Sequence, residues 1–165
     1  MFEKFTNNAR RAVFFARYEV LQRGLPEIDT RCLLLGTIRA DKDLMTRLLP
    51  ADPRQPARLR ADMEALLPEA NDPTSGVMSP RLSGAAKLAL CRAADESRRL
   101  RHWSIEPRHL LWGLVAVGGP ETACLKAHGI TLETVNGELA QAPSKPDRWA
   151  PFRRWITHTR AAVKP

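Results

Sequence analysis

Two arginines in repeated stretches of the sequence are the residues whose position most suggests binding chemistry. Arg31 and Arg108 occupy the same place in the stretches IDTRCLLLG and IEPRHLLWG, which lie 77 residues apart. A guanidinium fork binds carboxylates and phosphates, and the free N–H groups at the start of a helix favour the same anions. Each arginine also follows a carboxylate closely, Asp29 or Glu106, with which it can form a local ion pair. Two interpretations are therefore open, an anion site or two local ion pairs.

Cysteine and histidine side chains can bind a metal ion or act as nucleophiles, but their spacing favours neither role. Cys32 and His109 hold equivalent places in the two stretches, with His102 nearby, yet the chain has no C-x-x-C or H-x-x-x-H spacing. We therefore predict core packing and no metal or other cofactor. The other cysteines, Cys91 and Cys124, are also expected to be buried thiols, with no base beside Cys91. Because no Ser-His-Asp arrangement or carboxylate pair stands out, the sequence predicts a protein that is not an enzyme.

The helices that position these side chains can be placed from periodicity and capping residues. Alanine and valine recur at steps of three and four over Asn7–Arg23, with Thr6 as the expected cap. Asp29 and Glu106 take the cap positions before the two arginines, and Pro107 stands at a first helical position, where its missing N–H costs nothing. Shorter helices are expected over residues 42–49, 54–67, 121–128 and 132–140, the last with Thr131 as its cap.

An internal repeat organises the chain. Residues 5–38, moved along by 77, match the later segment at nine of 34 positions. With 44% hydrophobic and 27% charged residues, the 165-residue chain is typical of a globular protein. We predict an all-α fold of two tandem four-helix repeats packed with pseudo-twofold symmetry. The expected parts are repeat 1 at residues 1–67, a linker at 68–79, repeat 2 at 80–142 and a C-terminal extension at 143–165.

The charge of the chain indicates an anionic partner. The formal net charge is +8, which suits a nucleic acid, a membrane surface or an acidic polypeptide. The N-terminus has no apolar leader region, and no apolar run approaches the roughly 18 residues of a membrane span. We therefore predict a cytoplasmic protein without a membrane span.

The C-terminal extension combines aromatic and basic residues. Trp149, Phe152 and Trp155 recur at helical spacing, with Arg153 among them. This pattern is typical of a helix. Its aromatic side chains either pack on the repeats, dock a partner, or form a basic aromatic strip for nucleic acid or an anionic membrane.

The repeats resemble a known family. MFEKFTNNARRAVFFARYEVLQRG followed by IDTRCLLLG is similar to the opening of a Clp N-terminal repeat domain of the ClpA and ClpC type. HWSIEPRHLLWGL and VGGPETACLKAHGITLETVNGEL resemble the family's second copy, so the resemblance covers roughly residues 1–140. It implies a compact all-α domain of two four-helix repeats that binds polypeptide substrates, degrons or adaptor proteins. Because no G-x-x-x-x-G-K-[ST] loop is present, we expect a stand-alone recognition module without the ATPase modules.

The resemblance also gives candidate binding residues and one departure from the family pattern. Phe2, Thr6, Arg31 and Arg108 are the candidate peptide-binding residues. In ClpC-type members the resemblance implies two glutamates that grip phosphoarginine, and this chain has arginine at both places. We therefore expect a preference for acidic segments. The predicted function is a non-catalytic adaptor or regulator of Clp-dependent proteolysis, with polypeptide substrates, adaptors or a Clp ATPase as partners; the alternative is a small basic nucleic-acid-binding protein.

Overall fold

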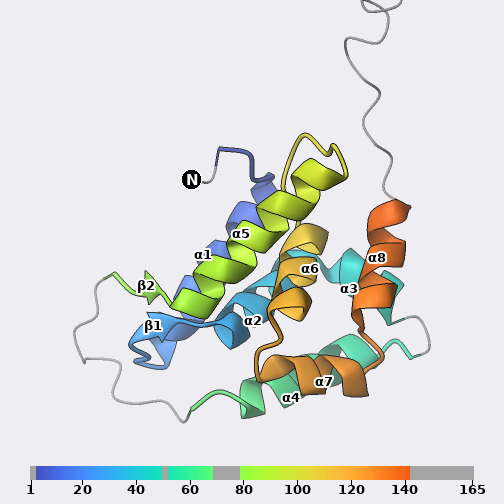
Figure 1. Cartoon of the computed structure of the whole chain (residues 1–165). Helices are drawn as coiled ribbons and strands as arrows, with labels where there is room; N and C mark the ends of the chain where they lie inside the picture. Colours follow the sequence, from blue (N-terminus) through green and yellow to red (C-terminus); the bar gives the residue numbers. More distant parts are fainter. Residues whose placement is uncertain (1–2, 50–51, 69–78, 142–165) are drawn as a thin grey trace, which may run out of the picture.

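Eight helices and two short strands make up the part of the chain that the structure describes, residues 3–49, 52–68 and 79–141 (Figure 1). The structure is a computed structural model. The helices are α1 (Asn7–Gln22), α2 (Thr30–Ala40), α3 (Lys42–Leu48), α4 (Gln55–Ala65), α5 (Gly84–Arg99), α6 (Pro107–Val117), α7 (Glu121–Ala127) and α8 (Leu132–Ala140). The strands are β1 (Glu27–Ile28) and β2 (Arg81–Leu82). The prediction of an all-α fold is confirmed.

Two helix pairs, α1 with α2 and α5 with α6, form the centre of the molecule. Thr6 caps α1 by accepting a hydrogen bond from the Ala9 N–H at 3.3 Å, and Ser83 caps α5 in the same way through the Ala86 N–H at 3.1 Å. The alanines of α1 and α5 face α2 and α6, whose leucines are almost wholly buried. Small side chains on one helix and large ones on the other therefore fill the space between each pair.

Equivalent glycines set how closely the paired helices approach. A Cβ atom added at Gly36 of α2 would lie 2.1 Å from the carbonyl oxygen of Ala12 in α1. At Gly113 of α6 the corresponding distance, to the carbonyl oxygen of Ala89 in α5, is 2.2 Å. Only glycine fits a backbone contact this close. This contact is the physical reason why both copies of the nine-residue stretch carry glycine at the same place.

The short strands join the two halves reciprocally. Ile28 of β1 pairs in parallel with Leu82 of β2, and Phe5 forms an isolated parallel bridge with Ile105. At an offset of 77 residues, Phe5 corresponds to Leu82 and Ile28 corresponds to Ile105. The Phe5–Ile105 pairing is therefore the equivalent of the Ile28–Leu82 pairing with the two halves exchanged. This exchange is what a twofold relation between the halves requires and therefore supports the predicted pseudo-twofold packing. Superposition of residues 5–67 on 82–140 remains the test of that prediction.

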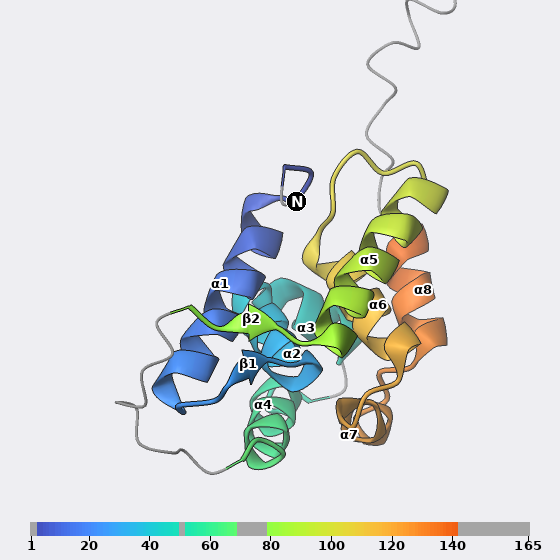
Figure 2. The same cartoon turned by 60° about the vertical axis from the view of Figure 1, so that its left-hand side comes forward.

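The shorter helices cover the far side of the central pairs. In both views α4 and α7 lie together at one end of the molecule (Figures 1 and 2), and in Figure 1 α3 lies near α8, with which it is in contact. An ion pair links the last two elements: Arg47 of α3 donates to Glu138 of α8, with 2.6 Å between Nη2 and Oε1. Each half therefore contacts the short helices of the other half.

Most sequence-based expectations on the helices are confirmed, and those on two cysteines differ from the structure. The helix bounds agree with prediction to within two residues, and the cap positions Thr6, Asp29, Glu106 and Thr131 are as predicted. Cys91, expected to be buried, is exposed because the buried face of α5 passes through its neighbour Leu90 instead. Cys124, also expected to be buried, is only partly buried.

Several predictions concern residues outside the described part of the chain. These are Phe2, most of the linker at 68–79, and the C-terminal extension at 143–165 with Trp149, Phe152, Arg153 and Trp155. The division into repeats, linker and extension therefore stays a prediction. Among the described helices, none has both the length and the apolar character needed to cross a membrane.

Candidate functional site

Arg31 lies in the first turn of α2 and is held by its own cap residue. Its Nε donates to Oδ2 of Asp29 at 2.7 Å, while Oδ1 of the same carboxylate accepts the Cys32 N–H at 2.9 Å. Nη1 of Arg31 donates to the carbonyl oxygen of Leu66, at the end of α4, at 2.8 Å. Nη2 of Arg31 also lies 2.5 Å from Oδ2 of Asp29. All three nitrogens of this guanidinium therefore have a partner.

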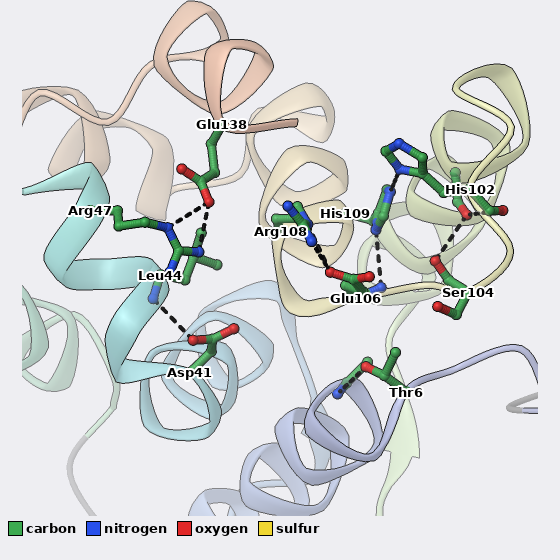
Figure 3. A network of polar contacts seen from close by, with 12 residues as sticks. Thr6, Asp41, Leu44, Arg47, His102, Ser104, Glu106, Arg108, His109 and Glu138 are labelled. Atoms are coloured by element: carbon green, nitrogen blue, oxygen red, sulfur yellow. Dashed lines mark hydrogen bonds and ion pairs between the residues drawn. The ribbon is translucent and has the colours of Figure 1, made fainter. Parts of the chain in front are cut away.

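Arg108 repeats this arrangement in the first turn of α6, with one difference (Figure 3). Its Nε donates to Oε2 of Glu106 at 2.9 Å, and its Nη2 contacts the same oxygen. No counterpart of the Leu66 contact holds Nη1 of Arg108 among the residues that the structure describes. Both local ion pairs considered from the sequence are therefore formed, and Arg108 keeps more donor capacity than Arg31.

A histidine pair supports the start of α6 from inside. Nδ1 of His109 accepts the backbone N–H of Glu106 at 3.0 Å, so the ring proton of neutral His109 resides on Nε2 and is donated to Nδ1 of His102 at 2.8 Å (Figure 3). Burial, and after it the charge of His102, lowers the pKa of His109 to about 4. The imidazole is therefore neutral at physiological pH and fixes the orientation of the helix start that carries Arg108.

A polar hollow of about 300 Å³ lies beside the start of α6, and residues of both halves line it. Thr6, the N-cap of α1, and Glu106, the N-cap of α6, both line it. Its other lining residues are Asn7, Asn8, Asp41 and Pro107. Of the predicted binding residues, Thr6 thus lines this hollow, and Arg108 is bound to the carboxylate of Glu106 at its wall.

The predicted binding residues do not all meet at this place. Arg31 contacts the end of α4 instead of the hollow, and Phe2 lies outside the described residues. Cys32 and His109 are both fully buried, as the prediction of core packing required. Burial, with a further contribution from Asp29, raises the pKa of the Cys32 thiol to about 12, so this thiol stays protonated at neutral pH.

Sequence reasoning missed an exposed apolar stripe on α1. Phe14 is 64% exposed, and Tyr18 and Leu21 follow it at steps of four and three residues. The guanidinium of Arg39 lies 4.4 Å from the ring centroid of Phe15 and 5.2 Å from that of Tyr18, which places positive charge along the stripe. The helical spacing of these residues is visible in the sequence. The alanines on the opposite side of the helix form a stronger pattern, and the prediction for this helix rested on them.

Comparison with known proteins relates this arrangement to one group of chaperones. No family model matches the chain. Its sequence is 25% identical over 143 residues to chaperone protein ClpB of Oceanobacillus iheyensis and 26% identical over 143 residues to the negative regulator of genetic competence ClpC/MecB of Bacillus subtilis. Each match covers 86% of this chain and 17% of the relative, and lies in its N-terminal region.

Solved structures agree with the sequence matches. The N-terminal domain of ClpD from Arabidopsis thaliana superposes with a TM-score of 0.62 at 23% identity, covering 85% of this chain and 97% of that domain. The chain has the fold of a Clp N-terminal domain. The Hsp104 N-terminal domain of Candida albicans, at a TM-score of 0.68 and 17% identity, covers 84% of the chain and 91% of that domain and has the same Clp N-terminal fold. Since the chain spans 17% of the length of the curated relatives named above, the likeness concerns their N-terminal domains and not their ATPase rings.

Proposed function

We propose that the protein is a non-catalytic polypeptide-binding module of the Clp N-terminal type. The observation that carries this proposal is the likeness to Clp N-terminal regions, over 86% of the chain in sequence and 85% in fold. The apolar stripe of Phe14, Tyr18 and Leu21 adds support, because unfolded polypeptides expose the apolar side chains that such a stripe accepts.

Within this module, the start of α6 is the proposed place for charge recognition. Nη1 of Arg108 has no partner among the described residues. The adjoining hollow is lined by the carboxylates of Asp41 and Glu106, so an acidic side chain would have to reach the Arg108 guanidinium beside it. Arg31 already donates hydrogen bonds to the Asp29 carboxylate and to the Leu66 carbonyl oxygen. An acidic side chain of a bound peptide can therefore add to the Arg108 pair more readily than to the Arg31 pair. We propose a preference for acidic peptides that depends mainly on Arg108.

The biological role proposed for this binding is that of an adaptor or regulator of Clp-dependent proteolysis. A module that binds the same polypeptides as a Clp ATPase either presents them to the ring or competes for them. Adding the purified chain to a degradation assay with the Clp ATPase and protease of the same organism distinguishes these roles, since presentation accelerates degradation and competition slows it. An unchanged rate at saturating chain concentration would argue against both roles.

The peptide preference is tested by fluorescence anisotropy with one acidic and one basic peptide of equal length. Wild type is expected to bind the acidic peptide more tightly, and Arg108→Glu to lose this preference by about tenfold or more, which corresponds to one charge-assisted hydrogen bond. Arg31→Glu is expected to change it less. Arg58→Glu is the matched control, because Arg58 is exposed on α4, is paired with Asp52, and carries the same change in charge.

Nucleic-acid binding is the rival function, supported by the net charge of +8. This net charge already subtracts the carboxylates, so it remains although many arginines of the described residues form ion pairs, among them Arg23, Arg31, Arg39, Arg47, Arg58, Arg60, Arg98, Arg99 and Arg108. Binding to random duplex DNA that weakens steeply with salt, with no binding to either peptide, would favour the rival.

A further inference from the structure

Three side chains with metal-binding chemistry meet where α4 contacts α7. They are Asp62 of α4, Cys124 of α7 and His128, the C-cap residue that directly follows α7. One donor atom from each lies within 4.8 Å of the other two. The group is distinct from Cys32, His102 and His109, which the sequence had brought to attention.

The geometry of the group suits a shared ion. Cys124 and His128 are four residues apart, so their side chains lie on one face of the helix end. His128 Nε2 and Asp62 Oδ2 are already 2.7 Å apart, a hydrogen-bond distance at which an N–H on Nε2 donates to the carboxylate. The His128 side chain is 14% exposed and that of Asp62 is 60% exposed, so an ion can reach the group from solvent.

A catalytic Cys-His-Asp arrangement is the other chemistry that these residue types offer. It requires a thiol whose pKa is lowered toward neutrality, so that the thiolate can attack. Here burial, and after it the charge of Asp62, raises the pKa of the Cys124 thiol. The His128 backbone N–H donates to the Cys124 carbonyl oxygen at 3.2 Å, but within the described part of the chain no side-chain hydrogen bond joins the Cys124 thiol to the His128 ring. Such a thiol is a poor nucleophile, whereas a bound cation would itself displace the proton.

We propose that Asp62, Cys124 and His128 form a binding site for a zinc-like divalent cation that joins α4 to α7. Sulfur, imidazole and carboxylate ligands together suit Zn²⁺ and Co²⁺, while Mg²⁺ and Ca²⁺ prefer oxygen ligands alone. The ion takes the place of the proton between His128 and Asp62: the proton of the neutral His128 ring moves from Nε2 to Nδ1, which leaves the Nε2 lone pair for the ion, and the Cys124 proton is released to solvent. With three side-chain ligands, the fourth tetrahedral position is left to water.

The site has a structural consequence because its ligands come from both halves of the chain. The segment with Asp62 lies before the linker, and Cys124 and His128 follow in the second half. A cation there ties the first half to the second at the end of the molecule where α4 and α7 lie together (Figure 2). Cation binding is therefore expected to stabilise the folded chain and to protect the backbone amides of α4 from hydrogen exchange.

Titration of the full, tag-free chain with Co²⁺ tests the site by absorption. We expect saturation at one ion per chain, with a thiolate-to-cobalt charge-transfer band that Zn²⁺ abolishes by displacement. Cys124→Ser should remove the band, and His128→Ala or Asp62→Asn should weaken the affinity at least tenfold. Cys91→Ser is the matched control, because Cys91 is an exposed thiol on α5, and it should retain both the band and the affinity.

Thermal unfolding gives an independent readout. At a Zn²⁺ concentration about a hundred times the dissociation constant, the Tm of wild type should rise by roughly 5–10 °C, and that of Cys124→Ser should not. Mg²⁺ at the same concentration should leave both unchanged. Absence of a saturable band, loss of the band in Cys91→Ser, or an equal Tm shift in wild type and Cys124→Ser would each overturn the site.

Discussion

Replacing Gly36 by alanine tests the close contact between α1 and α2. The added Cβ atom would lie 2.1 Å from the Ala12 carbonyl oxygen and 2.7 Å from the Ala16 nitrogen, both of them backbone atoms that no side-chain rotation can move. Relief requires the two helices to separate by about 1.4 Å, since atoms in contact keep roughly 3.5 Å from their neighbours. Overpacking of this kind costs about 1–3 kcal/mol, and a backbone clash belongs at the upper end of that range.

A cost of about 3 kcal/mol corresponds to a fall in Tm of roughly 6–12 °C for a chain of this size. Thermal unfolding followed by circular dichroism measures it. Gly137→Ala in α8 is the matched control, because a Cβ there meets nothing within 4 Å; it should stabilise the protein by about 0.5–1 kcal/mol through helix propensity. Gly113→Ala should resemble Gly36→Ala. If Gly36→Ala were as stable as wild type, or Gly137→Ala as damaging as Gly36→Ala, the account of the helix contact would be refuted.

Three further predictions concern buried acids and bases and the absence of a nucleotide loop. Burial lowers the pKa of His109 from 6.5 to about 4, so the neutral side chain contributes stability above pH 6.5. This contribution, about 3 kcal/mol, is lost as the pH falls from 6.5 toward 4, because the unfolded chain takes up the proton first. The free energy of unfolding of His109→Gln, measured in urea, should therefore fall less over that pH range than that of wild type. Burial raises the pKa of Glu121, so its ionised form costs stability as the pH rises above its ordinary value, and Glu121→Gln, which can still accept the Thr30 hydroxyl, should be more stable than wild type at pH 7. Purified protein should show no ATP hydrolysis, and activity that rises in proportion to purity would contradict a non-catalytic module.

Sequence reasoning predicted the helices well because their signals are local. Thr6, Asp29 and Thr131 each accept an N–H three residues later, a contact that depends only on the chain beside it. The nine-residue repeat likewise revealed the two arginines and their neighbouring carboxylates, whose pairing within two residues is also local.

Features that depend on contacts between the halves could not be predicted in the same way. The bridge between Phe5 and Ile105 joins segments that no local pattern relates. Cys124 and His128 are recognisable as neighbours on a helix, but their third partner, Asp62, is brought in only by the packing of α4 on α7. The exposure of Cys91 differed from prediction for a similar reason, since the edge of a buried face is decided by the helix packed against it.

The central claim, that the chain binds polypeptides, is tested most directly by titrating it into a labelled, permanently unfolded polypeptide and following the fluorescence anisotropy, with and without excess random duplex DNA. The account predicts saturable binding that persists when the DNA is present, because the apolar stripe on α1 contributes independently of charge. A flat titration, or binding that the DNA abolishes completely, would contradict it.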